Sequence, residues 1–328
     1  MDNLTHSLVG WALGQTGLKR KSRKGLAALI MGANAPDIDV FFGWVPWEPL
    51  ATHRGITHSL VVGLWVMPLL TAGFLWLLDR WQVRRGATFA SGLEMRFGWL
   101  LALAFIGCLT HPLLDWQTVY AVQLFSPFDL RWYHNDALFI IDVWVILALG
   151  AAIWLSRRWE RRGNDGWRRP AQAALAGVTA YIALNGVLGA LAREAPTVEV
   201  PYASPDTIVA SPPPALFWRR DVVWRQNGAI SQGRYDPLVD QFALTEYSAP
   251  TPDGMADPRV QRAARDPIAR KYLAWSIMPV ATVTVTTCGT MVRFGDARFR
   301  GFSANSLSRT VFLPTGGVGC ATAPGRAP

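Results

Sequence analysis

Long apolar runs alternate with short polar segments over roughly the first 195 residues of the chain. Four of these runs approach or exceed the length of about 20 residues that crosses a bilayer as a helix. They lie at roughly 57–79, 97–118, 137–156 and 171–192. Two shorter apolar segments, 3–18 and 25–45, precede them, and the sequence NAPDID interrupts the second. We therefore expect 25–45 to form a short or broken helix, which the membrane tolerates only where protein or a wet cavity covers it.

The pattern changes after about residue 195. Prolines cluster in EAPTVEVPYASPDTIVASPPP, and short alternating runs such as ATVTVTTCGTMVRF (281–294) then predict strands. The sequence therefore predicts a mainly α protein with two domains. A polytopic helical membrane domain spans 1–195, and a small β-rich extramembrane domain spans 196–328.

Basic residues flank the apolar runs and predict their orientation. The three basic segments are KRKSRK (19–24), the region 80–96 after the first long run, and the loop 157–170, whose stretch 157–169 carries six arginines. The positive-inside rule places these segments in the cytoplasm. The regions 46–56 and 119–136 and the C-terminal domain then lie on the opposite face. In a bacterium the predicted location is the inner membrane, with the C-terminal domain in the periplasm.

Composition supports a membrane protein over a nucleic-acid-binding one. The chain is 51% hydrophobic, has 16 tryptophans and carries a formal net charge of +9. Because the positive charge flanks apolar segments, we read it as membrane topology and expect no nucleic-acid partner. The N-terminal sequence MDNLTHSLVGWALG lacks a basic start, so we expect no cleaved signal peptide. Cys288 and Cys320 share the C-terminal domain, and whether they pair stays open.

All five histidines fall in the first 134 residues, and the predicted topology places each near the non-cytoplasmic face. They are His6, His53, His58, His111 and His134. Carboxylates accompany them at Asp37, Asp39, Asp115, Asp136 and Asp142. Ionisable residues in membrane segments are costly and mark functional sites. Neutral imidazoles with carboxylates are natural ligands for zinc and related divalent ions.

Three motifs carry this chemistry, and each has a simpler structural explanation. In HPLLD, His111 and Asp115 are four residues apart and share a helix face, so they either bind one ion or bond to each other at a helix end. In PDID, Asp37 and Asp39 either bind metal or cap a helix. HRGITHS places the imidazoles of His53 and His58 and two hydroxyls close to Arg54. The guanidinium of Arg54 is suited to binding phosphate or carboxylate. The alternative for this motif is an interfacial loop touching lipid headgroups.

Two histidines are less informative. His6, in DNLTHS, alone would be a residue of a capped helix start. His134, in RWYHND, is most simply a polar loop residue.

The order of TH (5–6), PDID (36–39), HRGITHS (53–59), HPLLD (111–115) and LFSPFDLRWY (124–133) resembles the bacterial YdjM-like family of inner-membrane proteins. This resemblance implies a membrane-bound metal-dependent hydrolase. Stretches 211–236 and 272–285 also resemble the extramembrane tail of many members. The family's metal residues carry over onto His6, Asp37, Asp39, His53, His58, His111 and Asp115.

A fainter similarity links these motifs to zinc-dependent phospholipase C and the S1/P1 nucleases. Those enzymes also use the N-terminal amine and a later H-x-x-x-E. No H-x-x-x-E follows His111, and Met1 is not an evident ligand. We therefore expect one or two ions, zinc or alternatively manganese, rather than three.

We expect the core ligands to be His6, Asp37, His58, His111 and Asp115. Asp39 and His53 would add ligands or support the imidazoles, and Asp39 is the expected general base. Arg54 would neutralise an oxyanion, with Arg131 as a second candidate. The hydroxyls that could orient the imidazoles are those of Thr5, Thr57 and Ser59.

The predicted function is hydrolysis of a phosphoester, such as a phospholipid, whose headgroup enters the site laterally at the outer face of the membrane. A bound ion would acidify a water and polarise the scissile bond. The alternative is a non-catalytic metal-binding membrane protein, either a transporter or a protein with a structural or regulatory metal. The C-terminal domain would cover the site, select substrate or bind an envelope protein.

Overall fold

The computed structural model describes residues 1–45, 52–198, 205–299 and 307–314. The chain divides into two compact units. The first holds Met1–Gly189 with Ser211–Trp218, and the second holds Ala190–Ala210 with Arg219–Pro328. The predicted order, a helical region followed by a smaller β-rich region, is confirmed.

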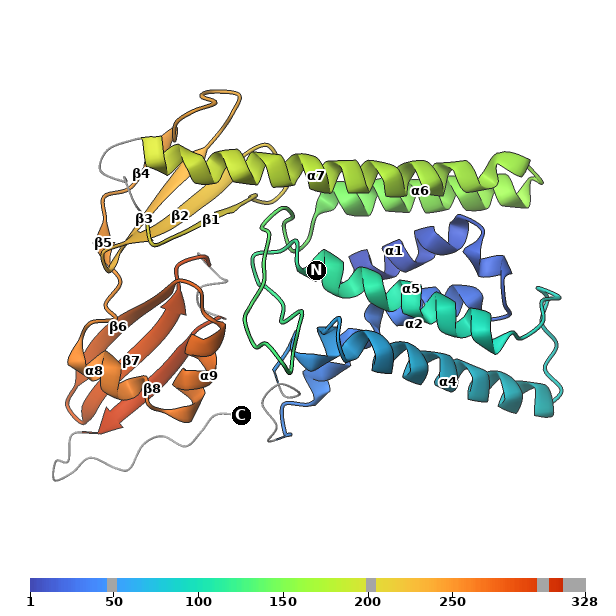
Figure 1. Cartoon of the computed structure of the whole chain (residues 1–328), viewed down its shortest axis with the longest axis horizontal. Coiled ribbons are helices and arrows are strands. Elements are labelled where there is room, and N and C mark those ends of the chain that lie inside the picture. The colour runs from blue at the N-terminus through green and yellow to red at the C-terminus, as the bar shows by residue number, and fades with distance from the viewer. Residues whose placement is uncertain (46–51, 199–204, 300–306, 315–328) are drawn as a thin grey trace. The chain divides into compact units, whose positions relative to one another are not determined.

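The first unit is built from α-helices, with short 3-10 turns in several of their connections and an irregular loop between α5 and α6 (Figure 1). Its α-helices are α1 (Asn3–Gln15), α2 (Gly25–Asn34), α4 (Gly63–Arg84), α5 (Phe97–Asp115), α6 (Val143–Arg161) and the larger part of α7 (Arg169–Val198). Its 3-10 turns are η1 (Leu18–Arg20), η2 (Ala35–Phe41), η3 (Ile56–His58) and η4 (Asp165–Arg168). The predicted break in segment 25–45 is confirmed, because α2 gives way to η2 at the sequence APDID.

Two helices begin several residues after the start of the apolar runs that predicted them. α4 begins at Gly63 rather than at 57, because Ile56–His58 forms a 3-10 turn and the Ser59 hydroxyl then accepts hydrogen bonds from the Val61 and Val62 amides. α6 begins at Val143 rather than at 137, because the Asp142 carboxylate caps its first amides.

Small residues let α1, α2 and α5 approach closely. A Cβ added at Gly10 of α1 would lie 2.7 Å from the Leu29 carbonyl oxygen of α2. A Cβ added at Gly32 of α2 would lie 2.5 Å from the Ala104 carbonyl oxygen of α5. Such small-residue contacts are typical of helices packed within membranes. They bring the polar residues at the ends of α1, α2 and α5 together.

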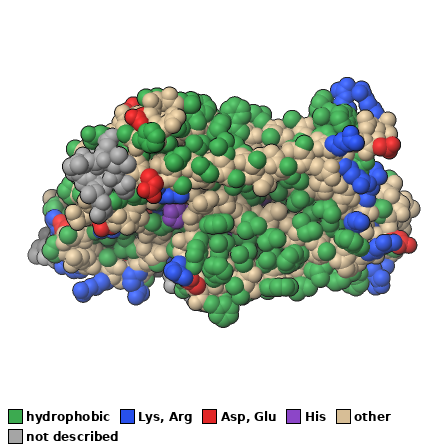
Figure 2. Space-filling model, turned by 45° about the horizontal axis from the view of Figure 1, so that its top comes forward, with side chains coloured by type: hydrophobic (Ala, Val, Ile, Leu, Met, Phe, Trp, Pro, Cys, Tyr) green, Lys and Arg blue, Asp and Glu red, His purple; other side chains and the backbone are tan. Residues whose placement is uncertain are grey.

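The three basic segments meet at one end of this unit. Arg20 pairs with Glu160 at 2.9 Å, so η1 lies against the end of α6. Arg23 holds Asp79 of α4 through two hydrogen bonds of 2.8 and 2.6 Å. Figure 2 shows Lys and Arg gathered at this end and hydrophobic side chains over the helices.

Among the helices that the structure describes, two have the length and apolar composition to cross a membrane. They are Phe97–Trp116 and Asp165–Ala195. The other two predicted spans correspond to α4, whose last turns contain Asp79, Arg80 and Arg84, and to α6, whose end carries Arg157, Arg158 and Arg161.

The second unit contains two antiparallel sheets and two short helices. The first sheet has the order β1–β2–β3–β4, with β5 also paired to β3. Its strands are β1 (Thr207–Ser211), β2 (Arg220–Gln226), β3 (Ala229–Tyr235), β4 (Glu246–Tyr247) and β5 (Thr251–Pro252). The second sheet and its helices comprise β6 (Pro279–Thr286), β7 (Gly289–Asp296), β8 (Arg309–Pro314), α8 (Pro258–Ala263) and α9 (Pro267–Trp275). The strands predicted over 281–294 are confirmed, and Cys320 lies outside the described residues.

Candidate metal centre

Four side chains from three elements converge at the end of the helical unit opposite the basic segments. Asp37 comes from η2, His58 from η3, and both His111 and Asp115 from the last turn and a half of α5. Along α5, His111 is fourteen residues from Phe97, or about 21 Å at 1.5 Å per residue. The helix continues through Pro112, so the prediction that His111 and Asp115 share a face is confirmed.

The four ligand atoms have the spacing of a metal coordination shell. His58 Nε2 and His111 Nε2 lie 3.1 Å apart, and each lies 3.3 Å from Asp37 Oδ1. Each also lies 3.4 Å from Asp115 Oδ2, and all four atoms lie within 4.8 Å of one another. A tetrahedral zinc ion with bonds of about 2.0–2.1 Å separates its ligands by about 3.3–3.4 Å. The donor set and its spacing therefore fit a small divalent cation.

Both imidazoles are oriented through their other nitrogen. His111 Nδ1 lies 2.6 Å from the Ala33 carbonyl oxygen, which accepts its hydrogen. His58 Nδ1 lies 3.1 Å from Asp39 Oδ2. With hydrogen on Nδ1, each ring directs the Nε2 lone pair into the cluster. Metal-ligating histidines are almost always held in this way.

Three of the four side chains of the cluster are buried, and the fourth is partly exposed. The side chains of His58, His111 and Asp115 are 0–1% exposed, whereas that of Asp37 is 15% exposed. Burial raises the pKa of the Asp37 carboxyl, but hydrogen bonds and charge from His111 and His58 outweigh it and hold that pKa far below its usual range. Asp37 is therefore ionised at neutral pH and is the cluster ligand that outside molecules reach.

Asp39 organises the HRGITHS turn rather than pointing into the cluster. Its Oδ1 lies 2.8 Å from His53 Nδ1, and its Oδ2 accepts hydrogen bonds of 2.8 Å from the Arg54 amide and the Thr57 hydroxyl. Burial raises the Asp39 pKa, but the hydrogen bonds of the two imidazoles, from His53 and His58, outweigh it and keep that pKa far below its usual range. These contacts hold Arg54 at φ 65°, in the left-handed region that non-glycine residues rarely adopt.

Arg54 is buried beside the cluster. Its Nε lies 3.1 Å from Asp115 Oδ2, its Nη1 donates to the Thr118 hydroxyl at 3.0 Å, and its guanidinium lies over the Tyr120 ring at 4.7 Å. Burial lowers the pKa of Arg54 to about 10, so the guanidinium is charged at neutral pH. These contacts indicate that the Arg54 guanidinium balances the charge of Asp115 and does not reach a substrate oxyanion. The second candidate, Arg131, pairs with Asp129 and lies over the Tyr133 ring, and its side chain is 79% exposed.

His6 lies next to the cluster without being one of its four members. Its ring stacks on that of His111, with centroids 3.7 Å apart, and its Nε2 lies 3.4 Å from Asp115 Oδ1. The same oxygen contacts the N-terminal amine of Met1, which the sequence had not singled out. Neither ring nitrogen of His6 has a hydrogen-bond partner among the described residues. Asp115 Oδ2, which faces the two imidazoles, is also without one there.

Buried polar atoms without partners are rare and call for a ligand, water or ion. The two nitrogens of His6 therefore add to the metal-like spacing of the cluster, whereas Asp115 Oδ2 already has the Arg54 guanidinium beside it. The Asp2 side chain caps α1 and fixes where that helix begins, so it is a local signal for the position of the Met1 amine. That this amine meets Asp115 depends on the packing of α1 against α5, which no local signal shows.

The other predicted site residues lie around the cluster or away from it. The Thr57 hydroxyl lies 3.1 Å from His58 Nδ1, whereas the Thr5 hydroxyl donates to Asp2. His134 pairs with Asp136 at 2.8 Å in the loop after α5. Asp142 caps α6 and accepts from the Tyr181 hydroxyl.

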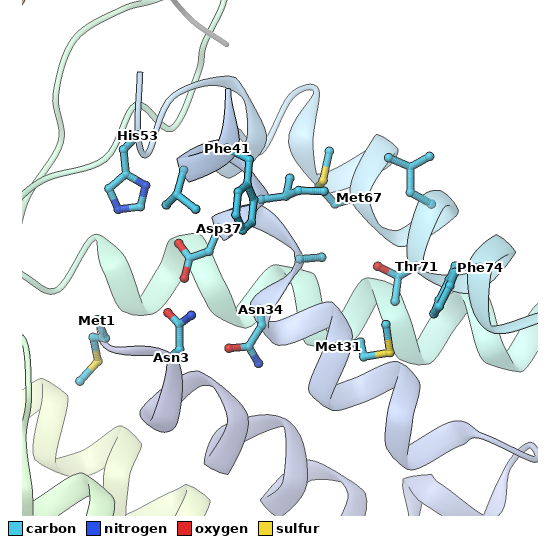
Figure 3. Close-up of a pocket in the computed structure, with 14 residues that line it drawn as sticks. Met1, Asn3, Met31, Asn34, Asp37, Phe41, His53, Met67, Thr71 and Phe74 are labelled. Carbon is cyan, nitrogen blue, oxygen red and sulfur yellow. The ribbon is translucent and has the colours of Figure 1, made fainter. Parts of the chain in front are cut away.

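A pocket of about 670 Å³ opens beside the exposed edge of the cluster. Figure 3 shows its polar end, where Asp37, His53, Asn3 and Asn34 lie close together, and its apolar part toward α4. His53 lines this pocket with a side chain that is 36% exposed and is held from behind by Asp39. The second spatial group with ligand spacing, Asp39, His53 and His58, therefore borders the pocket.

The fold and the site define the class: a helical protein with two candidate membrane spans and a buried His/Asp cluster that could hold a metal ion. The family model of the YdjM inner membrane protein matches residues 1–192, and the chain belongs to this family. No curated protein and no solved structure matches the chain. The family match ends before the two C-terminal stretches that resemble the tail of other members.

Proposed function

We propose that this protein is a membrane-bound metal-dependent hydrolase that cleaves a phosphoester of a membrane lipid. The observation that carries this proposal is the set of five ligand–ligand separations between 3.1 and 3.4 Å. Asp37, His58, His111 and Asp115 would hold one divalent ion, with zinc as the best match to the donor set. When bound, such an ion supplies an acidified water and polarises the scissile phosphoester.

Asp39 and His53 form a dyad on the pocket side of the cluster, and we assign proton transfer to it. Asp39 was the expected general base, but its oxygens are engaged by His53, His58, Thr57 and the Arg54 amide. His53 instead faces the pocket, and imidazole is the commonest general base in enzymes. In this assignment His53 Nδ1 donates to Asp39, and His53 Nε2 takes the proton of the attacking water.

The unit's surface supports insertion in a membrane with more than the two clearest spans. Large apolar side chains are exposed along α4, α6 and α7, as expected of a surface that faces lipid. Examples are Trp65 (63%), Leu77 (61%), Leu147 (62%) and Val187 (58%). We propose four spans, with the basic segments in the cytoplasm and both the cluster and the C-terminal unit on the periplasmic side.

The test begins with metal content. The protein is purified in detergent without chelators, and zinc and manganese are measured by elemental mass spectrometry. We expect about one bound equivalent, lost in a His58→Ala/His111→Ala double variant. His134→Ala is the matched control, because that imidazole bonds to Asp136 in a loop and should leave the metal content unchanged.

Turnover is then measured on phosphatidylglycerol vesicles and on a soluble bis-aryl phosphodiester. Activity that needs the metal and falls in His53→Ala supports the hydrolase. A second candidate, an ion that only ties η2, η3 and α5 together, is favoured by the near-complete burial of three of the four ligands. Metal bound at full occupancy without turnover of either substrate would select that structural role. If the wild-type protein carries no metal and is no more stable than the double variant, both the hydrolase and the structural role of an ion are refuted.

A further inference from the structure

The pocket at the candidate metal centre changes from polar to apolar along its length (Figure 3). At one end lie Asp37, His53 and Asn3, which offer a carboxylate, an imidazole and an amide. The lining toward α4 is formed by apolar side chains, chiefly Met31, Met67, Leu70 and Phe74. Such a gradient suits a molecule with a polar head and a hydrocarbon tail.

The apolar part of the pocket opens on a hydrophobic surface. Leu70 is 58% exposed and Phe74 is 54% exposed on α4, and Phe41 is 72% exposed on η2. From Met67 to Phe74 the α4 helix advances about 10 Å at 1.5 Å per residue. The tail of a molecule in the pocket would therefore run along α4 from the cluster toward the lipid-facing side.

The size of the pocket limits its occupant. A volume of about 670 Å³ falls in the range of sites for small molecules. Methionine is flexible, and Met31 and Met67 let such a wall adapt to chains of different shape. A purely hydrocarbon ligand would leave the carboxylate and the imidazole at the polar end without a partner.

We infer that this pocket binds one acyl chain of a membrane phospholipid and places the headgroup ester at Asp37 and His53. This inference rests on the proposed function for the chemistry at the headgroup, but the binding of the chain does not need turnover. It predicts that the substrate enters sideways between η2 and α4, with its tail still in contact with the bilayer.

The experiment maps where an acyl chain lies. Full-length protein in nanodiscs is photolysed with phosphatidylglycerol that carries a diazirine on one acyl chain, and adducts are located by peptide mass spectrometry. We expect adducts concentrated on Met31 and on Leu70–Phe74. Leu70→Trp fills the pocket and should lower these adducts about tenfold, because it displaces a few buried methylenes.

Leu77→Trp is the matched control. Leu77 is on the same helix, has the same side chain and is 61% exposed, but it does not line the pocket. Met31→Trp provides a second filled pocket from a different helix. Each variant is accepted only if its metal content and elution volume equal those of the wild type, which shows that the fold and the cluster are intact.

The outcomes separate the two proposals. Adducts that fall in both pocket variants and persist in Leu77→Trp support the acyl site, whether or not the protein turns over lipid. Adducts that are as frequent on Leu77 as on Leu70, or that are unchanged in both pocket variants, would overturn it. If the wild-type protein shows the expected adduct pattern but no metal-dependent turnover, the result counts against the hydrolase and leaves the acyl site supported.

Discussion

Replacing Asp39 by asparagine tests how the imidazoles of the cluster are held. The Asp39 carboxylate is 2% exposed and accepts from the Arg54 amide and the Thr57 hydroxyl while contacting His53 and His58. An amide keeps the shape, but it has one acceptor oxygen and turns an N–H group toward another donor. His58 Nδ1 then loses its charged partner, so its Nε2 is less basic and less well aimed.

The expected loss follows from the type of contact removed. Changing a partner of a metal-ligating histidine typically costs 10–100-fold in metal affinity, or about 1.4–2.8 kcal/mol. Asp37→Asn removes a ligand atom itself and should cost more than Asp39→Asn. Asp136→Asn is the control, because Asp136 is 1% exposed and bonds to His134 in the same way without reaching the cluster.

Affinity is measured by competition with a chromophoric zinc chelator in detergent at neutral pH. The ranking expected is wild type equal to Asp136→Asn, then Asp39→Asn, then Asp37→Asn. If Asp39→Asn abolishes binding as completely as Asp37→Asn, Asp39 is itself a ligand, and our reading of its contacts is wrong. Wild-type affinity in Asp39→Asn would refute the orienting role.

Two further predictions concern stability. Gly10→Ala places a Cβ 2.7 Å from a carbonyl oxygen of α2 and should cost about 1–3 kcal/mol of unfolding free energy by thermal melting, whereas Gly73→Ala, with nothing within 4 Å, should not destabilise. In the β-rich unit, burial raises the Asp296 pKa, but the charge and hydrogen bonds of Arg298 outweigh it and lower that pKa. Its stabilisation is therefore present above about pH 4 and is lost as the pH falls below that value. Asp296→Asn should remove this pH dependence and speed hydrogen exchange in β6–β7, costing about 3 kcal/mol. Asp257→Asn should leave that exchange unchanged, because asparagine still caps α8 and the partner Arg259 reaches water.

The parts of the site set by local chemistry could be predicted from the sequence. The i,i+4 spacing of His111 and Asp115 already places both on one face of α5, and a proline followed by alternating acids predicts that α2 stops before Asp37. Helix periodicity and the basic clusters also predict which end of the bundle holds the histidines.

The parts that depend on contacts between distant segments could not be predicted. The HRGITHS turn is shaped by a carboxylate 15 residues before Arg54 and 18 residues before Thr57. The apolar run alone therefore predicted a helix from 57, when His58 lies in a 3-10 turn. The position of His6 beside Asp115 likewise depends on the close approach of α1 to α2 and α5, which the sequence shows only as scattered glycines.

The contact between His111 and the Ala33 carbonyl, 78 residues apart, also constrains how the protein is made. The chain is synthesised from its N-terminus at about 5–20 residues per second, so about 4–16 s pass between the two residues. Asp37 and His58 are synthesised within that interval, before the cluster residues of α5. An ion bound by all four residues would therefore be loaded only after α5 is in place, late in membrane insertion, and would not be the trigger of insertion.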